Sequence, residues 1–132
     1  MTDQGITLDA SVLIALTSAR DPHHAQAVGL MRSSLLRRDL LIHPINMAEA
    51  AVRPTARGIL ESVRGMWQLL GVCVAAVDSE QVWRLAALRV ETGLEMPDCC
   101  VVDTAQRTAT PLATFDLRLA QQAEQLGVDL AL

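Results

Sequence analysis

Lysine and tyrosine are absent from this chain of 132 residues, and one phenylalanine and two tryptophans are its only large aromatic residues. All eleven basic residues are therefore arginines, and the net charge is -4. A protein that coats nucleic acid generally carries a basic surplus, so the charge argues against that class. So few aromatic side chains also exclude a broad base-stacking platform. Neither absence excludes a nuclease, because acidic residues can bind a cation while arginines hold phosphates.

Long hydrophobic runs are missing as well. Hydrophobic residues make up 51% of the chain, but stretches such as 11–17 and 69–77 fall short of the roughly 20 residues that span a membrane. Residues 1–9 contain acidic residues and no basic region before an apolar core, which is unlike a secretory signal. We expect no membrane segment and a cytoplasmic location.

Cysteine is scarce, with three residues in all. Cys99 and Cys100 are adjacent and Cys73 is distant, so the spacing fits neither a zinc site nor a redox motif. We expect three buried free thiols, which behave as small hydrophobic residues.

Apolar periodicity and turn residues predict alternating strands and helices in one compact domain over residues 1–132. The expected strands cover residues 6–8, 40–43, 72–77, 111–114 and 128–130. The expected helices cover residues 11–16, 21–38, 45–52, 55–70, 79–93, 97–107 and 116–125. This alternation is typical of an α/β fold, a small and mostly parallel sheet flanked by helices.

Two of these helices carry more specific expectations. Pro54 should limit the helix over 45–52, because proline lacks the backbone N–H that a helix interior needs. In the helix that Gly93 ends, a repeat of apolar residues at helical spacing predicts the buried face. That face would consist of Val82, Leu85, Ala86 and Val90.

Four carboxylates lie in short apolar segments, where a lone charge is costly. Asp9 and Asp116 follow expected strands, whereas Glu49 and Asp98 lie in expected helices. The carboxyl ends of parallel strands form the ligand-binding edge of an α/β sheet, so these four acids can meet there. Acids brought together repel each other unless a cation lies between them.

The chemistry of such a group of acids points to a hard cation. Carboxylate oxygens without a Cys or His partner favour Mg²⁺ or Mn²⁺ over zinc, and such an ion supports phosphodiester hydrolysis. Taken singly, Asp9, Asp98 and Asp116 have a simpler explanation as helix caps, and Glu49 as a solvated side chain. The occurrence of all four together favours one shared site.

Four segments around these acids resemble, in order and spacing, the motifs of PIN-domain ribonucleases, particularly the VapC-type toxins of bacterial toxin-antitoxin pairs. They are LDASVLIAL at 8–16, NMAEA at 46–50, MPDCCVV at 96–102 and LATFD at 112–116. The resemblance implies a PIN-like domain and an Mg²⁺- or Mn²⁺-dependent endoribonuclease. It implies catalytic and metal-binding roles for the four acids, which Ser11 and Thr114 support. It also implies an RNA substrate, a homodimer and inhibition by a VapB-type antitoxin.

The chain departs from the family pattern at several positions. Asp103 stands where a small residue is common, roughly 140° around an ideal helix from Asp98. We expect it to face solvent rather than to extend the acidic group. Cys99 and Cys100 replace small or aliphatic residues as core variation, and Leu119 replaces a frequent aromatic residue.

The remaining polar candidates are histidines and arginines. His23, His24 and His43 match no established ligand spacing, and we expect His24 to pack or to form a hydrogen bond. Three arginines after Glu49 either bind RNA or an acidic partner, or form a solvated helical face. They are Arg53, Arg57 and Arg64.

Two other functions fit part of the pattern. One is a catalytically silent PIN-fold module that binds a partner, which a missing acid would favour, although none is missing. The other is a metal-dependent phosphoesterase that acts on DNA, which the acids alone do not distinguish from a ribonuclease. No base-reading motif identifies an RNA target.

Overall fold

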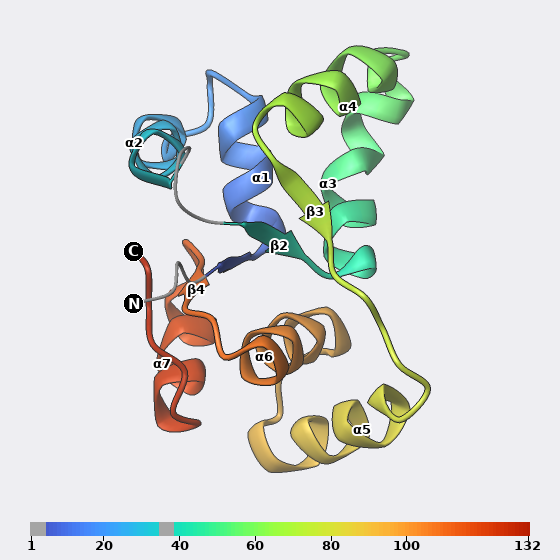
Figure 1. Ribbon diagram of the computed structural model, residues 1–132, viewed down its shortest axis with the longest axis vertical. Coiled ribbons are helices and arrows are strands. Elements are labelled where there is room, and N and C mark those ends of the chain that lie inside the picture. Colours follow the sequence, from blue (N-terminus) through green and yellow to red (C-terminus); the bar gives the residue numbers. More distant parts are fainter. Residues whose placement is uncertain (1–4, 35–38) are drawn as a thin grey trace.

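The computed structural model describes residues 5–34 and 39–132, and its centre is a four-stranded sheet (Figure 1). The strand order is β3-β2-β1-β4. The strands are β1 (Ile6–Leu8), β2 (Leu40–Ile42), β3 (Val72–Val74) and β4 (Leu112–Ala113). All three strand pairings are parallel, which confirms the predicted α/β fold. The last expected strand is reduced to one parallel bridge between Leu130 and Leu112.

Seven helices in the described part of the chain connect and cover these strands. They are α1 (Ala10–Thr17), α2 (His24–Ser34), α3 (Pro44–Ala56), α4 (Leu60–Leu69), α5 (Gln81–Thr92), α6 (Met96–Thr108) and α7 (Leu117–Gln125). Figure 1 shows α1 to α4 in the upper half of the view and α5 to α7 in the lower half. Both α1 and α6 contact β1, and α6 also contacts α3. The end of β1 therefore lies where several helices meet.

The core consists of two groups of buried side chains. One lies between β1, β2 and the first helices and includes Ile6, Leu13 and Ile42, each 0% exposed. The other joins α6, α7 and β4 and includes Val101 and Leu119. Burial of such side chains contributes about 1.5–3 kcal/mol each. These groups hold β1 and β4, the strands that precede two of the four acids, in fixed positions.

The helix α3 extends beyond its predicted end. Pro54 lies inside α3, which continues to Ala56. The residue that terminates the helix is Gly58, two positions after Ala56, and its φ of 71° suits glycine. The Gly58 N–H donates to the Thr55 carbonyl and the Ile59 N–H to the Pro54 carbonyl, a Schellman ending. The next helix, α4, therefore starts at Leu60 rather than near Thr55.

The predicted buried face of α5 is wrong at three of its four positions, whereas Leu85 is half-buried and packs against the core. Val82 is 59% exposed and Val90 is 87% exposed, and Ala86 is exposed too. The buried residues of α5 are Gln81 and Leu88. Gln81 points inward because it forms hydrogen bonds with buried polar groups. These hydrogen bonds, rather than the apolar pattern, set the orientation of α5.

Two further expectations need correction. Cys73 is exposed, whereas Cys99 and Cys100 are buried, and all three are free thiols. The apolar run over 72–77 forms a strand only over its first three residues, and Val77 is 46% exposed. The predicted end of the second helix at 35–38 lies outside the described residues. No helix within residues 5–34 and 39–132 is long and apolar enough to span a membrane.

Candidate active site

Asp9 lies directly after β1, at the start of α1, and is 7% exposed. Its side chain does not cap α1. Its Oδ2 accepts hydrogen bonds from Ser11 Oγ at 2.7 Å and from Thr114 Oγ1 at 2.9 Å. Thr114 follows β4, the neighbour of β1. Asp9 therefore ties the ends of these two strands together.

The two hydroxyl groups are themselves oriented by backbone N–H groups. Ser11 Oγ accepts a hydrogen bond from the Phe115 N–H at 3.1 Å, and Thr114 Oγ1 accepts one from the Asp116 N–H at 3.0 Å. Because each hydroxyl accepts from the backbone, its proton is directed at Asp9. Two hydrogen bonds therefore hold Oδ2 of Asp9, whereas its other carboxylate oxygen accepts no hydrogen bond from the described residues.

Asp116 is exposed and caps α7. Its Oδ1 accepts hydrogen bonds from the N–H groups of Arg118 at 3.0 Å and Leu119 at 3.2 Å. Helix capping, the simpler explanation given for this residue, is therefore correct. Because Oδ1 receives both bonds, capping leaves Oδ2 available for a ligand.

Asp98 lies in the first turn of α6 and is half-buried. It accepts no hydrogen bond from the described residues. Burial, and after it the negative charges of Asp9, Asp116, Glu49 and Glu95, together raise the pKa of Asp98 to about 6. The other three candidate acids therefore lie close enough to Asp98 to act on its carboxyl electrostatically.

Glu49 reaches the same region from α3 and is exposed. Its Oε1 accepts a hydrogen bond from Asn46 Nδ2 at 3.3 Å. The same nitrogen donates to the Pro97 carbonyl at 3.1 Å, which joins α3 to the start of α6. Asn46 is 0% exposed, and its Oδ1 is buried without a hydrogen-bond partner among the described residues.

These donors suit a hard divalent cation chemically. Carboxylate oxygens, free of His and Cys, match Mg²⁺ or Mn²⁺. The raised pKa of Asp98 reflects burial and the charges of nearby acids, and Asn46, which binds one of these acids, has a buried oxygen without a partner among the described residues. Within the described residues, however, no three His, Cys, Asp or Glu side chains converge as closely as a complete metal-ligand set would. The acids are gathered at one edge of the sheet without forming a closed cage.

Asp103 does not face solvent as predicted. It is 1% exposed and binds Arg84 Nε at 2.7 Å and Arg107 Nε at 3.3 Å. Gln81 Nε2 also donates to it at 3.1 Å. Burial by itself raises the pKa of Asp103, but the hydrogen bonds from Arg84 and Gln81 outweigh burial, and the net shift is downward. Asp103 is thus a paired structural carboxylate outside the acidic site.

The histidines have three different surroundings. His24 Nδ1 forms a hydrogen bond with the Ala15 carbonyl at 2.7 Å, which confirms its expected role. His43 caps α3 by accepting from the Ile45 N–H at Nδ1, so Nε2 donates to Gln81 Oε1 at 2.9 Å. The ring of His23 stacks on Phe115, with 4.4 Å between ring centroids and 10° between planes.

Sequence reasoning missed the polar groups that organise these regions. The hydrogen bonds of Asn46 and Gln81 depend on contacts between separate helices, which no local pattern reveals. The stack of His23 on Phe115 likewise joins distant parts of the chain. Of the three arginines after Glu49, Arg64 lies 3.6 Å from exposed Glu61, as on a solvated helical face.

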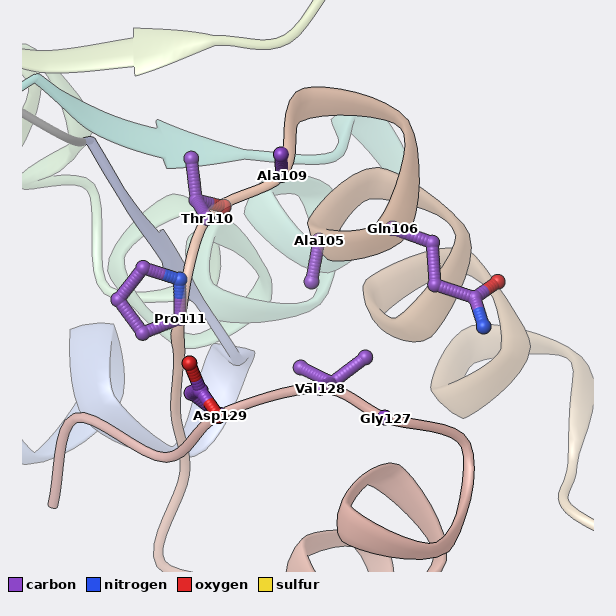
Figure 2. Close-up of a pocket in the computed structure, with 8 residues that line it drawn as sticks. All are labelled: Ala105, Gln106, Ala109, Thr110, Pro111, Gly127, Val128 and Asp129. Atoms are coloured by element: carbon purple, nitrogen blue, oxygen red, sulfur yellow. The ribbon is translucent and has the colours of Figure 1, made fainter.

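A cavity of about 410 Å³ lies away from the acids (Figure 2). It lies between the end of α6 and the segment over 127–129, and its polar lining includes Gln106, Thr110 and Asp129. Thr110 precedes β4, whereas Asp116 follows it, so the cavity lies at the opposite end of this strand. None of the predicted site residues lines it.

The model of the PIN domain family matches residues 6–125. Among solved structures, a toxin-antitoxin complex from Klebsiella pneumoniae is similar at 23% identity and a TM-score of 0.70, covering 85% of this chain and 87% of that one. VapC20 from Mycobacterium tuberculosis, a toxin that cleaves the sarcin-ricin loop, is similar at 18% identity and 0.70, covering 89% and 94%.

A third similar structure is VapBC2 from Rickettsia felis bound to a DNA fragment from its promoter. It shares 12% identity at a TM-score of 0.70, over 95% of this chain and 96% of that one. At these identities the likeness is one of fold. No curated protein matches the chain.

Proposed function

Because this chain belongs to the PIN domain family, we propose that it is a metal-dependent endoribonuclease and the toxin of a toxin-antitoxin pair. The fold is shared with a toxin that cleaves the sarcin-ricin loop and with proteins from toxin-antitoxin complexes. The single observation that carries the proposal is Asp98, which is half-buried and accepts no hydrogen bond from the described residues. Burial, and after it the charges of other acids, among them Asp9, Asp116 and Glu49, raise its pKa to about 6.

In this proposal the four acids are catalytic and hold Mg²⁺ or Mn²⁺. When bound, the ion orients a water molecule and neutralises charge that builds on the scissile phosphodiester. Asp9 presents its free oxygen, since Ser11 and Thr114 hold the other. Asp116 presents Oδ2 while Oδ1 caps α7. Asn46 orients Glu49.

The proposal extends to partners and location. We propose a cytoplasmic protein that cleaves RNA, forms a homodimer and is inhibited by a VapB-type antitoxin. An exposed apolar face on α5 supports burial against another protein, because such faces are uncommon on surfaces that stay free. That face consists of Val82, Trp83, Ala86 and Val90.

The experiment is cleavage of a structured RNA pool that includes tRNA, with Mg²⁺ or Mn²⁺ and with EDTA. Asp98→Asn should lower the cleavage rate by about 10³-fold, because the transition state loses a group that positions charge at the scissile phosphate. Glu95→Gln is the matched control: it also removes a charge near Asp98, but Glu95 is exposed and outside the four acids. It should cleave like the wild type.

Four outcomes contradict the proposal. Cleavage that survives EDTA would exclude metal dependence, and full activity in Asp98→Asn would exclude this site. Cleavage of a matched DNA at the same rate would make the protein a general phosphodiesterase. If RNA stays intact under every condition, the PIN fold serves binding alone.

A further inference from the structure

The ring pair of His23 and Phe115 lies beside the acidic site. Phe115 is the residue between Thr114, which binds Asp9, and Asp116. Its backbone N–H donates to Ser11 Oγ, the other hydroxyl on Asp9. The backbone of Phe115 is thus fixed within the site, and its ring extends from there to His23.

His23 presents the free surface of this pair. Its ring is stacked on Phe115 at nearly parallel planes, yet its side chain remains 45% exposed. The residue is held by a turn before α2, in which the His23 N–H donates to Asp21 Oδ1 at 2.8 Å. A planar ring that is stacked on a second ring, held by its backbone and still 45% exposed has the form of a stacking surface.

The aromatic composition makes this position distinctive. Phe115 is the only phenylalanine and tyrosine is absent. Trp67 is 2% exposed and donates to Thr17, so it belongs to the core, and Trp83 lies on the outer face of α5. The only stacked ring pair within the described residues is therefore the one next to the acids.

We propose that the exposed face of His23, backed by Phe115, stacks one unpaired nucleobase of the RNA and so positions the neighbouring phosphodiester at the acids. This inference rests on the proposed ribonuclease activity and makes His23 a positioning residue. Unpaired RNA bases are commonly recognised by stacking on aromatic side chains, histidine included. A single stacking contact of this kind needs no broad aromatic platform, which this chain lacks.

The test uses the strongest cleavage site in the RNA pool, copied into a short oligoribonucleotide. One nucleotide at a time is replaced by an abasic nucleotide, which keeps the phosphate and removes the base. For the wild type we expect one position next to the cut at which the abasic change lowers kcat/KM by at least about five-fold, or about 1 kcal/mol. In His23→Ala that loss should shrink, because the ring that stacks on the base is removed and only the Phe115 ring beneath it remains.

Two further variants separate stacking from structure. His23→Phe keeps a ring without the ring nitrogens and should restore the sensitivity to the abasic nucleotide. Gln26→Ala, an exposed change on α2, is the control and should keep the wild-type profile. Thermal unfolding of each variant verifies that the fold is intact.

Two results would overturn the inference while leaving the ribonuclease in place. One is an abasic profile that is the same in the wild type and in His23→Ala. The other is a uniform loss of activity in His23→Ala on every oligonucleotide, which indicates a structural stack. Failure of the wild-type protein to cleave any RNA would overturn the inference and the proposed function together.

Discussion

Asp98 and Asp103 lie five residues apart on the same helix, α6, in opposite electrostatic surroundings. Asp103 is buried with Arg84 and Arg107, and its pKa is lowered. Asp98 accepts no hydrogen bond from the described residues, and burial together with the charges of nearby acids raises its pKa to about 6. The partners decide the role: a carboxylate paired with arginine stabilises the fold, whereas an unpaired one among other acids is available to a ligand.

The largest effect on stability should come from Asp103→Asn. The change leaves Arg84, Arg107 and Gln81 without the charge that joins α5 to α6. Removing one partner of a buried ion pair costs roughly 3–5 kcal/mol, and we expect about 2–4 kcal/mol because both arginines can turn toward water. Urea unfolding at pH 7 measures it. A loss too small to detect would show that this network contributes nothing to the fold.

The same substitution at Asp98 should have the opposite sign. Asp98 has a pKa of 3.8 in the unfolded chain and about 6 in the folded protein. Between these values the folded state binds more protons, so stability falls as pH rises. Asp98→Asn removes that penalty and should stabilise the protein by about 1–2 kcal/mol at pH 7, once solvent screening is included.

The pH dependence supplies the control for this pair of variants. As the pH falls below 3.8 the carboxyl of Asp98 becomes protonated in both states, so the gain from Asp98→Asn should disappear. The contribution of Asp103 has the other sign: its lowered pKa means that its stabilisation is present above pH 3.8 and is lost as the pH falls. Unfolding curves from about pH 2.5 to about pH 7.5 cover both trends. A constant difference between wild type and Asp98→Asn would contradict them.

The smallest effect is expected from an exposed ion pair. Arg64 and Glu61 lie 3.6 Å apart on α4, with side chains 59% and 90% exposed. Water screens such pairs and little stability is gained from them. Glu61→Gln should unfold at the same urea concentration as the wild type. A clear loss would mean that exposure is a poor guide to the energetics of charges in this protein.

Much of the fold was predictable from local sequence. The strands β1, β2 and β4 and the helices around the acids follow from apolar runs and turn residues such as Gly93, which ends α5. The failures concern helix orientation. The apolar pattern of α5 favours Val82 and Val90 as buried residues, but Gln81 accepts a hydrogen bond from His43 and donates one to Asp103, and these bonds turn the helix the other way.

The candidate site was predictable only in part. The positions of Asp9 and Asp116 after parallel strands could be read from the chain, since strand ends place such residues at one edge. The orientation of Asp103 could not, because its partners Arg84 and Arg107 come from the neighbouring helix and from its own next turn. The support from Asn46 and the His23–Phe115 stack depend on the same kind of distant contact.

Binding of Mn²⁺ most directly tests the distinction between Asp98, an unpaired carboxylate available to a cation, and Asp103, a paired carboxylate that stabilises the fold. Calorimetric titration of the wild type, Asp98→Asn and the control Glu95→Gln compares three proteins that differ by one charge near the acids. We expect the wild type and Glu95→Gln to bind with similar affinity, and Asp98→Asn to bind at least about 10-fold more weakly, as is typical when a metal site loses a supporting group. Equal binding by all three would contradict the assignment of Asp98 to a cation site.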